Sequence, residues 1–340
     1  MDSKKIKIGI VGCGRAGTEF YVPACRVLPE VEIACVVDAL PKRARETAER
    51  FDIAYSSDRY EDLFDRVDAA ILAIPHHLHA PTAIDFLKRG IGVLCEKPLA
   101  TSYQDALCIV EASESGQAVL AVSLMRRSSP GSRITKDVLD RGFLGPIQRA
   151  DIEEGFLAPR PATAAWLYNK EQAGGGMLIS NGIHALDLLF WWFNAGARVV
   201  RYQDDSFSGI EANASIALEV GNGTQSFPGT IELSLMRRLR NTVILTGAQG
   251  TLELPVHGGH PVKIQMLHEG REEERLLVSS EQPKTGINAF AAEVREFASA
   301  VAERKSGFIT GRSHLEAMRV ISDCYATRQL FMNPWERIAQ

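Results

Sequence analysis

The fold is decided by the N-terminal stretch Ile6-Lys7-Ile8-Gly9-Ile10-Val11-Gly12-Cys13-Gly14-Arg15-Ala16-Gly17. An apolar, strand-like run ends there in a Gly-x-Gly-x-x-Gly motif, and a helix-length amphipathic segment follows. Gly12 permits a tight turn, Gly14 lets backbone N–H groups approach a pyrophosphate, and Gly17 allows a helix to pack closely on the strand. In this context the motif predicts the first βαβ unit of a dinucleotide-binding sheet.

Short apolar runs and helix-length amphipathic segments alternate over the first ~120 residues, which is typical of repeated βαβ units. Pro41 suits the first turn of a helix, and Pro23 should kink its helix or end it early. We therefore expect a Rossmann domain, a doubly wound parallel sheet, over residues 1–123. Its expected strands are 6–11, 33–37, 69–74, 91–95 and 118–122, and its expected helices are 16–27, 41–51, 75–89 and 102–115.

The pattern changes after this domain, because strand-sized alternating runs separated by Gly or Asn turns replace the helical spacers. We expect an α+β domain over residues 124–340 for substrate binding and oligomerisation, with a largely antiparallel or mixed sheet and a last helix that can pack back on the first domain. A partner chain could cover one face of this sheet, so a homodimer or homotetramer is predicted. The expected strands are 147–156, 198–206, 214–220, 229–235, 241–246, 251–254, 262–267 and 274–278, and the expected helices are 130–141, 286–305 and 313–332.

Composition sets the broad class. The 340 residues are 45% hydrophobic and 24% charged, with a net charge of −4, which excludes a disordered chain and argues against nucleic acid as a partner. The N-terminal apolar run is too short for a signal peptide, and residues 183–193 fall far short of the ~20 that span a membrane. The six cysteines show no Cys-x-x-Cys spacing, which suits free thiols in a reducing, cytoplasmic compartment.

Asp38 lies 21 residues after Gly17, at the end of the second expected strand. A carboxylate there accepts hydrogen bonds from a ribose 2′-hydroxyl and repels a 2′-phosphate, so NAD is favoured over NADP. Lys42 or Arg43 could hold a phosphate, which keeps NADP as the alternative. An incidental Asp after a glycine-rich turn is the purely structural alternative.

Two further motifs carry candidate chemistry. Glu96-Lys97-Pro98 follows an apolar strand. A Lys before Pro is most often solvated, but at this strand end it could reach a substrate hydroxyl, and burial would lower its pKa toward the range useful for acid/base catalysis.

After the triplet Gly174-Gly175-Gly176, a helix would stack Ser180 and His184 on one face with Asp187 adjoining. A helical His is usually a core residue, yet a hydroxyl and an imidazole on one face favour a polar pocket wall.

The combination of motifs resembles one family. The segments are Ile8-Gly9-Ile10-Val11-Gly12-Cys13-Gly14, Glu96-Lys97-Pro98, Gly174-Gly175-Gly176 followed by Gly182-Ile183-His184, and Gly247-Ala248-Gln249-Gly250-Thr251-Leu252. In this order they are similar to the glucose–fructose oxidoreductase/inositol dehydrogenase/rhizopine catabolism (Gfo/Idh/MocA) family, from Lys5 to about Leu330. The resemblance implies a Rossmann domain with an open-faced sheet domain, and NAD(P)-dependent oxidation or reduction of a secondary alcohol of a sugar, inositol or similar polyol.

The resemblance also implies roles for single residues. Lys97 would be the acid/base residue, His184 would touch the reacting hydroxyl, and Pro75, His76 and His79 would line the nicotinamide. The residues expected at the dinucleotide are Gly12, Gly14, Arg15, Ala16, Asp38, Arg43, Ile74, Pro75, His76, His79, Glu96 and Lys97. Those expected at the substrate are Lys97, Arg126, Trp166, Tyr168, Ser180, Asn181 and His184, with Lys97, His184 and Ser180 as the catalytic set.

One residue departs from the family pattern. The family usually has Asp where this sequence has Ser180, and a serine hydroxyl hydrogen-bonds but is no base near neutral pH without activation. The leading hypothesis is therefore a dehydrogenase or ketoreductase that uses Lys97. The alternatives are a redox-assisted glycosidase or epimerase that recycles its NAD, and a catalytically silent dinucleotide-sensing regulator.

Two histidine clusters invite other interpretations. His76-His77-x-His79 lacks a carboxylate or Cys to complete a metal set, so no metal site is expected. His257-Gly258-Gly259-His260 is expected to be a hairpin turn between two late strands.

Overall fold

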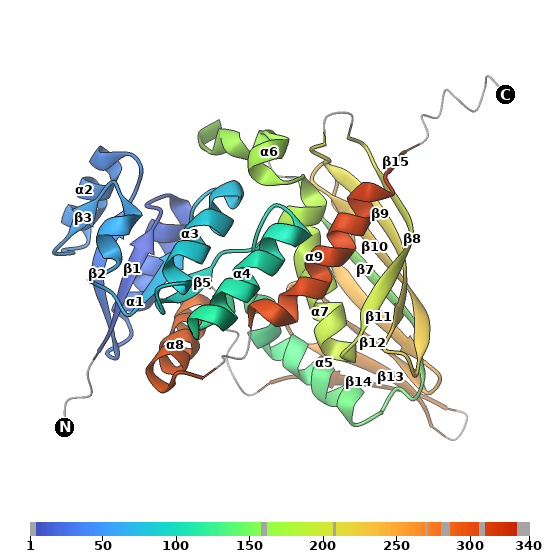
Figure 1. Ribbon diagram of the computed structural model, residues 1–340. Coiled ribbons are helices and arrows are strands. Elements are labelled where there is room, and N and C mark those ends of the chain that lie inside the picture. The colour runs from blue at the N-terminus through green and yellow to red at the C-terminus, as the bar shows by residue number, and fades with distance from the viewer. Residues whose placement is uncertain are drawn as a thin grey trace. The chain divides into compact units, whose positions relative to one another are not determined.

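The computed structural model describes residues 5–157, 162–206, 209–268, 271–279, 286–305 and 310–331, and its secondary structure is shown in Figure 1. The chain divides into two compact units. The first comprises residues 1–125 and 284–315, and the second comprises residues 126–283 and 316–340.

A six-stranded sheet forms the centre of the first unit, with strand order β3-β2-β1-β4-β5-β6 and parallel pairing throughout. The order reverses between β1 and β4, and in such sheets ligands bind at the carboxyl ends of the strands beside this point. The predicted doubly wound sheet is confirmed. The strands are β1 (Ile6–Val11), β2 (Val31–Val37), β3 (Ser56–Ser57), β4 (Ala69–Leu72), β5 (Gly92–Cys95) and β6 (Leu120–Val122).

Helices connect these strands largely where the sequence predicts them. The main helices are α1 (Val22–Arg26), α2 (Pro41–Arg50), α3 (His79–Leu87), α4 (Tyr103–Gly116) and the later α8 (Ile287–Glu303), with short turns η1 (Ala16–Tyr21), η2 (Tyr60–Leu63) and η3 (His76–Leu78). Ser102 caps α4 by accepting a hydrogen bond from the Asp105 N–H at 3.1 Å. The predicted helix 16–27 is divided: η1 is a π-helical turn, and Pro23, which has no N–H to donate, is the second residue of α1, directly after the π-helical turn ends.

The second unit contains a nine-stranded mixed sheet with order β14-β13-β12-β11-β7-β10-β9-β8-β15. The pairs β10 with β7 and β15 with β8 are parallel and the others antiparallel, as expected for a mixed sheet. The strands are β7 (Ile147–Gly155), β8 (Gly196–Asp204), β9 (Asn213–Gly221), β10 (Ser226–Ser234), β11 (Thr242–Gly247), β12 (Gly250–Pro255), β13 (Val262–His268), β14 (Arg271–Leu277) and β15 (Gln329–Leu330).

Helices pack on one face of this sheet, which is visible in Figure 1. They include α5 (Pro130–Asp140), α7 (Ile183–Phe193) and the part of α9 (Gly311–Ala326) that belongs to the second unit. The shorter elements are η4 (Met125–Ser128), η5 (Ala162–Tyr168), α6 (Lys170–Ala173) and η6 (Leu178–Gly182). Strand β9 alternates strictly between buried and partly exposed residues, so one face of this strand points into the interior.

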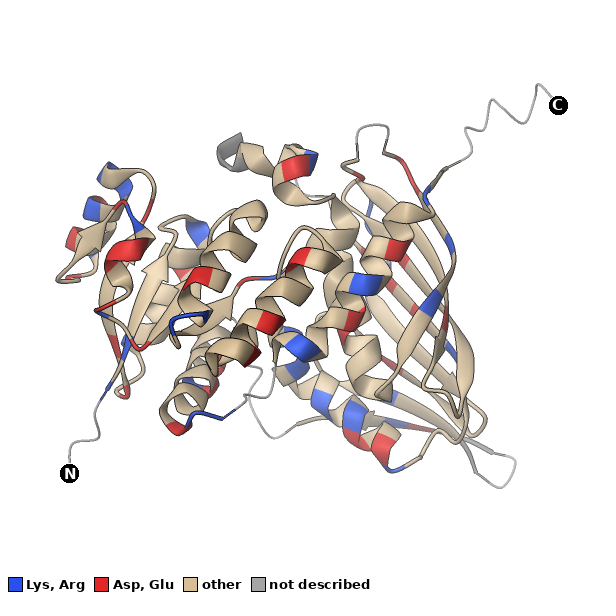
Figure 2. Cartoon of the chain, viewed as in Figure 1, with Lys and Arg blue, Asp and Glu red and all other residues tan. Residues whose placement is uncertain are grey.

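The other face of the sheet carries polar side chains and ion pairs. Arg198 pairs with Glu219, and Arg240 pairs with Glu153. Figure 2 shows both signs of charge on the helices and strands of each unit. Within the described residues, no helix is long and apolar enough to cross a membrane.

The predicted last helix, 313–332, is wrong at its C-terminal end. Helix α9 ends at Ala326, and β15 then pairs with β8. Arg328 causes the change of direction, because its guanidinium forms an ion pair with the buried Asp204 at 2.7 Å. This contact is tertiary, so the helical periodicity of the sequence does not contain it.

A buried ion pair ties η4 to α7. The Arg127 guanidinium donates two hydrogen bonds to the Asp187 carboxylate, at 2.8 and 2.6 Å. Both side chains are buried. Asp187, expected beside the candidate histidine, therefore belongs to the interior of the second unit.

We expect Arg127→Met to lower the free energy of unfolding by about 3–5 kcal/mol, because it leaves a buried carboxylate without its partner. Chemical denaturation measures this. The matched control is Arg141→Met, which breaks an exposed pair with Asp137 at 2.8 Å and should cost less than about 1 kcal/mol. The double variant Arg127→Met/Asp187→Leu should recover most of the loss. Equal stability of Arg127→Met and the wild type would contradict the prediction.

Candidate functional site

The glycine loop after β1 has the geometry that dinucleotide binding requires. Gly12 has φ +104°, and a Cβ added there would lie 2.2 Å from the Ala73 carbonyl oxygen. A Cβ at Gly17 would lie 2.0 Å from the Gly12 carbonyl oxygen, so the helical turn η1 can approach the strand only with glycine at both positions. A Cβ at Gly14 would meet no described atom within 4 Å. The loop is therefore open at the position where a pyrophosphate would approach.

Asp38 follows β2 and is nearly fully buried beside this loop. Its Oδ2 accepts a hydrogen bond from the Cys13 N–H at 3.0 Å, and its Oδ1 accepts one from the Leu40 N–H at 3.0 Å. The half-exposed Arg43 guanidinium lies 3.5 Å from Oδ2. The exposed Lys42 pairs instead with Glu46 at 3.7 Å.

The other residues expected at the dinucleotide lie on the same edge of the sheet. Arg15 is exposed and pairs with Glu19 at 2.9 Å, and Ala16 begins η1. Ile74 and Pro75 follow β4 directly, and His76 begins η3.

His79 is buried, and its ring contacts the backbone next to Lys97. Its Nδ1 lies 2.8 Å from the Pro98 carbonyl oxygen, and its Nε2 lies 2.9 Å from the Ile74 carbonyl oxygen. Burial lowers the pKa of His79, against the opposing effect of these carbonyl contacts. The His76 ring packs on it at 5.7 Å between centroids. Both nitrogens of His79 thus contact protein carbonyls, which links the end of β4 to the segment after β5.

Lys97 follows Glu96 at the carboxyl end of β5 and is partly buried. Glu96 Oε2 accepts a hydrogen bond from the Lys97 N–H at 3.1 Å, and its Oε1 accepts one from the Tyr21 hydroxyl at 2.9 Å. Burial raises the pKa of Glu96, while the charge of Lys97 and these hydrogen bonds oppose the rise. The candidate acid/base lysine therefore has a carboxyl group fixed directly beside it.

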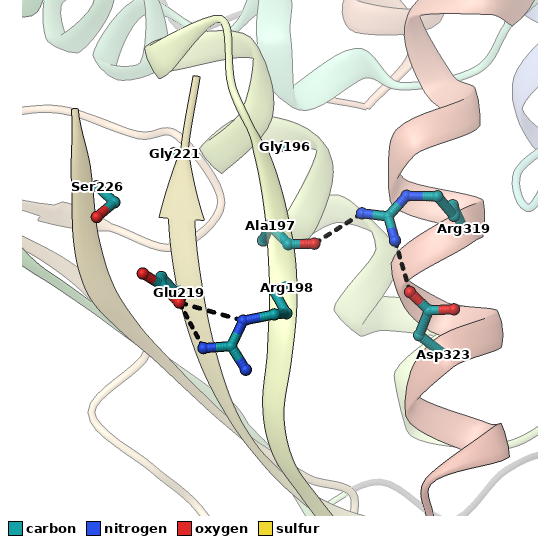
Figure 3. A pocket seen from close by; sticks show the side chains of 8 residues that line it. All are labelled: Gly196, Ala197, Arg198, Glu219, Gly221, Ser226, Arg319 and Asp323. Carbon is teal, nitrogen blue, oxygen red and sulfur yellow. Dashed lines mark hydrogen bonds and ion pairs between the residues drawn. The ribbon is translucent and has the colours of Figure 1, made fainter. Parts of the chain in front are cut away.

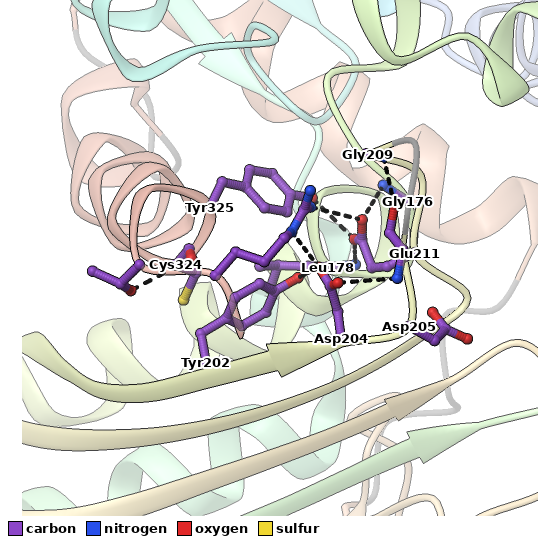
Figure 4. Close-up of polar contacts among 12 residues, drawn as sticks. Gly176, Leu178, Tyr202, Asp204, Asp205, Gly209, Glu211, Cys324 and Tyr325 are labelled. Carbon is purple, nitrogen blue, oxygen red and sulfur yellow. Dashed lines mark hydrogen bonds and ion pairs between the residues drawn. The ribbon is translucent and has the colours of Figure 1, made fainter. Parts of the chain in front are cut away.

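In the second unit, Glu211 holds the glycine triplet (Figure 4). Its carboxylate accepts hydrogen bonds from the Gly176 N–H at 2.9 Å, the Leu178 N–H at 2.8 Å and the Tyr325 hydroxyl at 3.0 Å. A Cβ at Gly175 would lie 2.0 Å from the Tyr325 hydroxyl oxygen, and one at Gly176 would lie 2.0 Å from the Glu211 carbonyl oxygen. Residues 175 and 176 are glycine because these partners leave no room for side chains, whereas Gly174 has φ +82°, a conformation that favours glycine.

An arginine completes this cluster. The Arg328 guanidinium lies 2.7 Å from Asp204 and 3.8 Å from Glu211, and the Tyr202 hydroxyl donates to Asp204 at 2.8 Å. Burial raises the pKa of Glu211, against the hydrogen bonds that it accepts.

Ser180 and His184 follow the triplet, but the segment is not a simple α-helix. Residues Leu178–Gly182 form a π-helical turn, and α7 begins after it, so the expected α-helical stacking of Ser180 below His184 does not apply. The Ser180 hydroxyl donates to the Gly176 carbonyl at 2.6 Å and lies 3.3 Å from Asn181 Oδ1. His184 is buried in the first turn of α7.

Arg126, expected at the substrate, is engaged inside the second unit. It donates to both oxygens of Glu154, at 2.8 and 2.7 Å, and Asn181 Nδ2 lies 3.4 Å from Glu154 Oε1. Arg126 lowers the pKa of Glu154, although burial opposes this. Burial, and then the Arg126 charge, lower the pKa of His257, which lies in the turn between β12 and β13.

Sequence reasoning missed two of these acids. Glu154 occupies a buried position of β7, between residues whose side chains alternate in burial. A charged residue on the apolar face of an amphipathic strand was the available signal. Glu211 offered no such signal, because it stands in a short connection between β8 and β9.

The remaining expected substrate residues lie on η5. Tyr168 is 55% exposed and Trp166 is half-buried.

A hollow of about 400 Å³ lies elsewhere in the second unit, between β8, β9 and β10 and helix α9 (Figure 3). It is lined by the pair Arg198 and Glu219 and by Arg319, which hydrogen-bonds the Ala197 carbonyl at 2.6 Å. None of the site residues predicted from the sequence lines it. Among the described residues, no cluster of three or more His, Cys, Asp or Glu side chains could hold a metal ion.

Comparison with known proteins identifies the family. Residues 6–124 match the model of the oxidoreductase family with an NAD-binding Rossmann fold, and residues 133–253 match the GFO/IDH/MocA C-terminal domain. A dTDP-3,4-didehydro-2,6-dideoxy-alpha-D-glucose 3-reductase of Streptomyces violaceoruber is 26% identical over 94% of this chain and 92% of its own. An inositol 2-dehydrogenase of Rubrobacter xylanophilus is 32% identical over 56% of this chain and 53% of its own.

Solved structures share the fold. An aldose-aldose oxidoreductase from Caulobacter crescentus superposes with a TM-score of 0.83 at 21% identity, covering 95% of this chain and 97% of that one. A 3-ketoreductase from Actinomadura kijaniata, in complex with NADP and TDP-benzene, gives 0.81 at 21% identity, covering 97% and 100%. A levoglucosan dehydrogenase in complex with NADH and levoglucosan gives 0.82 at 19% identity, covering 95% and 98%. With the two domain models matched in order along the chain, this protein belongs to the GFO/IDH/MocA family of oxidoreductases, which have an N-terminal NAD(P)-binding Rossmann fold.

Proposed function

We propose that this enzyme transfers a hydride between NAD and a secondary alcohol or ketone of a cyclic polyol or sugar derivative, with Lys97 as the acid/base. The observation that carries the proposal is the position of Lys97 at the carboxyl end of β5, on the sheet edge that also carries the open glycine loop. The names of relatives, an inositol dehydrogenase and a deoxysugar 3-reductase, support the substrate class.

The chain's own residues fit the cofactor. The loop at Gly12 and Gly14 would hold the pyrophosphate through backbone N–H groups, and Asp38 would accept hydrogen bonds from the adenosine ribose. Bound nicotinamide supplies or accepts the hydride. Lys97 would exchange the hydroxyl proton at its Nζ, beside the Glu96 carboxyl group.

Ser180 would contribute a hydrogen bond but no base. Its proton already goes to the Gly176 carbonyl at 2.6 Å, so the oxygen retains lone pairs that accept from a substrate hydroxyl. His184 would hydrogen-bond the same substrate oxygen. Proton exchange therefore depends on Lys97.

Lys97→Ala should lower turnover by ~10²–10⁴-fold, because it removes the general acid/base, while NAD affinity stays nearly unchanged. A spectrophotometric screen of inositols, hexoses, uronic acids and amino or keto sugars with NAD and NADP first identifies a substrate; NADH absorbance then measures turnover. The exposed Lys88 provides the control Lys88→Ala, with turnover unchanged. Wild-type turnover in Lys97→Ala would refute the mechanism.

The Ser180→Ala variant should lose less turnover than Lys97→Ala, because the hydroxyl only orients the substrate. The Ser180→Asp variant supplies the usual family residue, and its turnover on the same substrate shows whether serine is adapted to that substrate. A loss with Ser180→Ala as large as that with Lys97→Ala would contradict the assigned roles.

We expect NAD to bind more tightly than NADP, by about tenfold or more, because Asp38 presents a carboxylate to the ribose. Calorimetric titration with each dinucleotide measures the difference. The Arg43→Ala variant is the informative comparison, since Arg43 lies against Asp38 and is the nearest cation that could hold a 2′-phosphate. Tighter NADP binding in the wild type, lost in Arg43→Ala, would contradict the proposed preference.

We also propose that copies of the chain associate through the polar face of the nine-stranded sheet, as a dimer or tetramer in the cytoplasm. The helices described in the second unit cover only the other face of the sheet, which leaves this one for a second copy, and six free cysteines suit a reducing compartment. Light scattering at micromolar concentration should give at least twice the chain mass. A monomer would refute the proposal.

A further inference from the structure

A line of four polar side chains runs through the first unit and ends beside Lys97. The Tyr21 hydroxyl lies 2.9 Å from Glu96 Oε1, and the Ser123 hydroxyl lies 2.8 Å from Glu293 Oε2. The Ser123 side chain also lies close enough to Tyr21 to lower the pKa of its hydroxyl group, against the larger effect of burial, so the four side chains form a continuous line. Its members come from η1, the ends of β5 and β6, and α8. Glu96, Tyr21, Ser123 and Glu293 are therefore one hydrogen-bonded chain with a carboxyl group at each end.

The Glu293 end of this chain is buried on the apolar side of α8, next to Val294 and one turn from Phe290 and Phe297. Its Oε1 is buried without a hydrogen-bond partner among the described residues. Burial raises the pKa of Glu293 to about 8, and the charge of Glu96 adds to the rise.

Among the described residues that chiefly act on Glu293, none is a cation that would keep it ionised. They are Ser123, the Leu124 backbone N–H, Glu96 and Glu296, with Tyr21 beyond Ser123. On the far side, Glu96 faces Lys97 and the thiol of Cys95. The only cationic group in the set is therefore Lys97, next to Glu96.

Hydroxyl groups can donate once and accept at the same time. When Glu293 is neutral, it donates to Ser123, Ser123 donates to Tyr21, and Tyr21 donates to the Glu96 carboxylate. Every hydroxyl of the chain then gives one hydrogen bond and accepts one, all in the same direction. When Glu293 is ionised, Ser123 turns to donate to it, and the Tyr21 oxygen loses its donor.

We propose that Glu293 and Glu96 share a single proton, which passes between them through Ser123 and Tyr21 and so places the pair's one negative charge beside Lys97 or away from it. The inference rests on the proposed role of Lys97. Glu293 acts through Glu96 and is a positioning residue.

The transfer balances within the chain. The O–H bond of Glu293 breaks as one forms at Ser123, the former Ser123 proton moves to Tyr21, and the former Tyr21 proton moves to Glu96 Oε1. Glu293 becomes the carboxylate and Glu96 the neutral acid. While Lys97 is an ammonium ion, the negative charge is most stable on Glu96. Once Lys97 has given its proton to the substrate oxygen, the charge moves to Glu293.

Infrared spectroscopy tests the shared proton without substrate. Difference spectra of the NAD-bound enzyme between about pH 6 and about pH 10 should show the C=O band of a neutral carboxyl group that disappears as pH rises. The band should be absent from Glu293→Gln. It should persist in Glu303→Gln, a control at the exposed end of the same helix. A wild-type enzyme without a titrating band, or a band that survives in Glu293→Gln, would overturn the proposal.

Stability gives a second readout that needs no activity. Unfolded Glu293 loses its proton near the ordinary value of 4.5 and folded Glu293 only near 8, so between these values the unfolded state binds fewer protons. Wild-type stability must fall across this window relative to that of Glu293→Gln. The melting temperature of Glu293→Gln minus that of the wild type should therefore increase from pH 4.5 to 8. A constant difference would overturn the proposal.

Kinetics tests the connection to Lys97. Tyr21→Phe keeps the packing on Phe290 but breaks the line, so Glu96 can no longer take up the Glu293 proton and keeps its negative charge beside Lys97. The basic limb of the kcat/KM profile should therefore move by about one pH unit to higher pH. The control Tyr60→Phe removes a hydroxyl that donates to Asp85 at 2.8 Å in the same unit and should leave the profile unchanged. An unshifted profile in Tyr21→Phe would overturn the link. Failure of the Lys97 mechanism would be seen separately, in Lys97→Ala, with the infrared band intact.

Discussion

The candidate site of the second unit depends on one buried carboxylate. The Glu211 carboxylate accepts hydrogen bonds from the N–H groups of Gly176 and Leu178, where η6 begins. Loss of this carboxylate would leave two buried donors without partners, and each would lower the free energy of unfolding by about 1–3 kcal/mol. The close approach of Glu211 and Tyr325 explains why residues 175 and 176 are glycine. The backbone that carries Ser180 and His184 therefore takes its path from a connection and a helix that lie far along the chain.

The two units bury acidic groups in different ways. Asp187 and Glu154 each receive two hydrogen bonds from an arginine. At Glu154, burial raises the pKa, but Arg126 outweighs it and the pKa is lowered. Among the described residues, Glu293 receives a side-chain hydrogen bond from the Ser123 hydroxyl and none from an arginine, and burial raises its pKa, so its neutral form is favoured. A buried acid with an arginine is a structural charge, whereas one without a cation is a place where a proton can be held.

Local signals were sufficient for much of the fold. Strand β1 and the start of α2 at Pro41 follow from a strand-sized apolar run and from the preference of proline for the first helical turn. The site was less predictable, because its acids act over long separations: Glu154 meets Arg126 from 28 positions away, and Glu293 meets Ser123 from 170. The π-helical turn η6 was missed for the same reason, since its first N–H group, that of Leu178, donates to Glu211, which lies 33 positions away in the sequence.

Asp38 shows how recognition and folding can be joined in one side chain. The carboxylate that faces the proposed ribose site also fixes Cys13 in the glycine loop and Leu40 before α2. Its replacement would therefore disturb the loop as well as the choice of nucleotide. A change of preference toward a phosphorylated cofactor is therefore easier through Lys42 and Arg43, whose side chains hold no backbone N–H group of the loop, than through Asp38 itself.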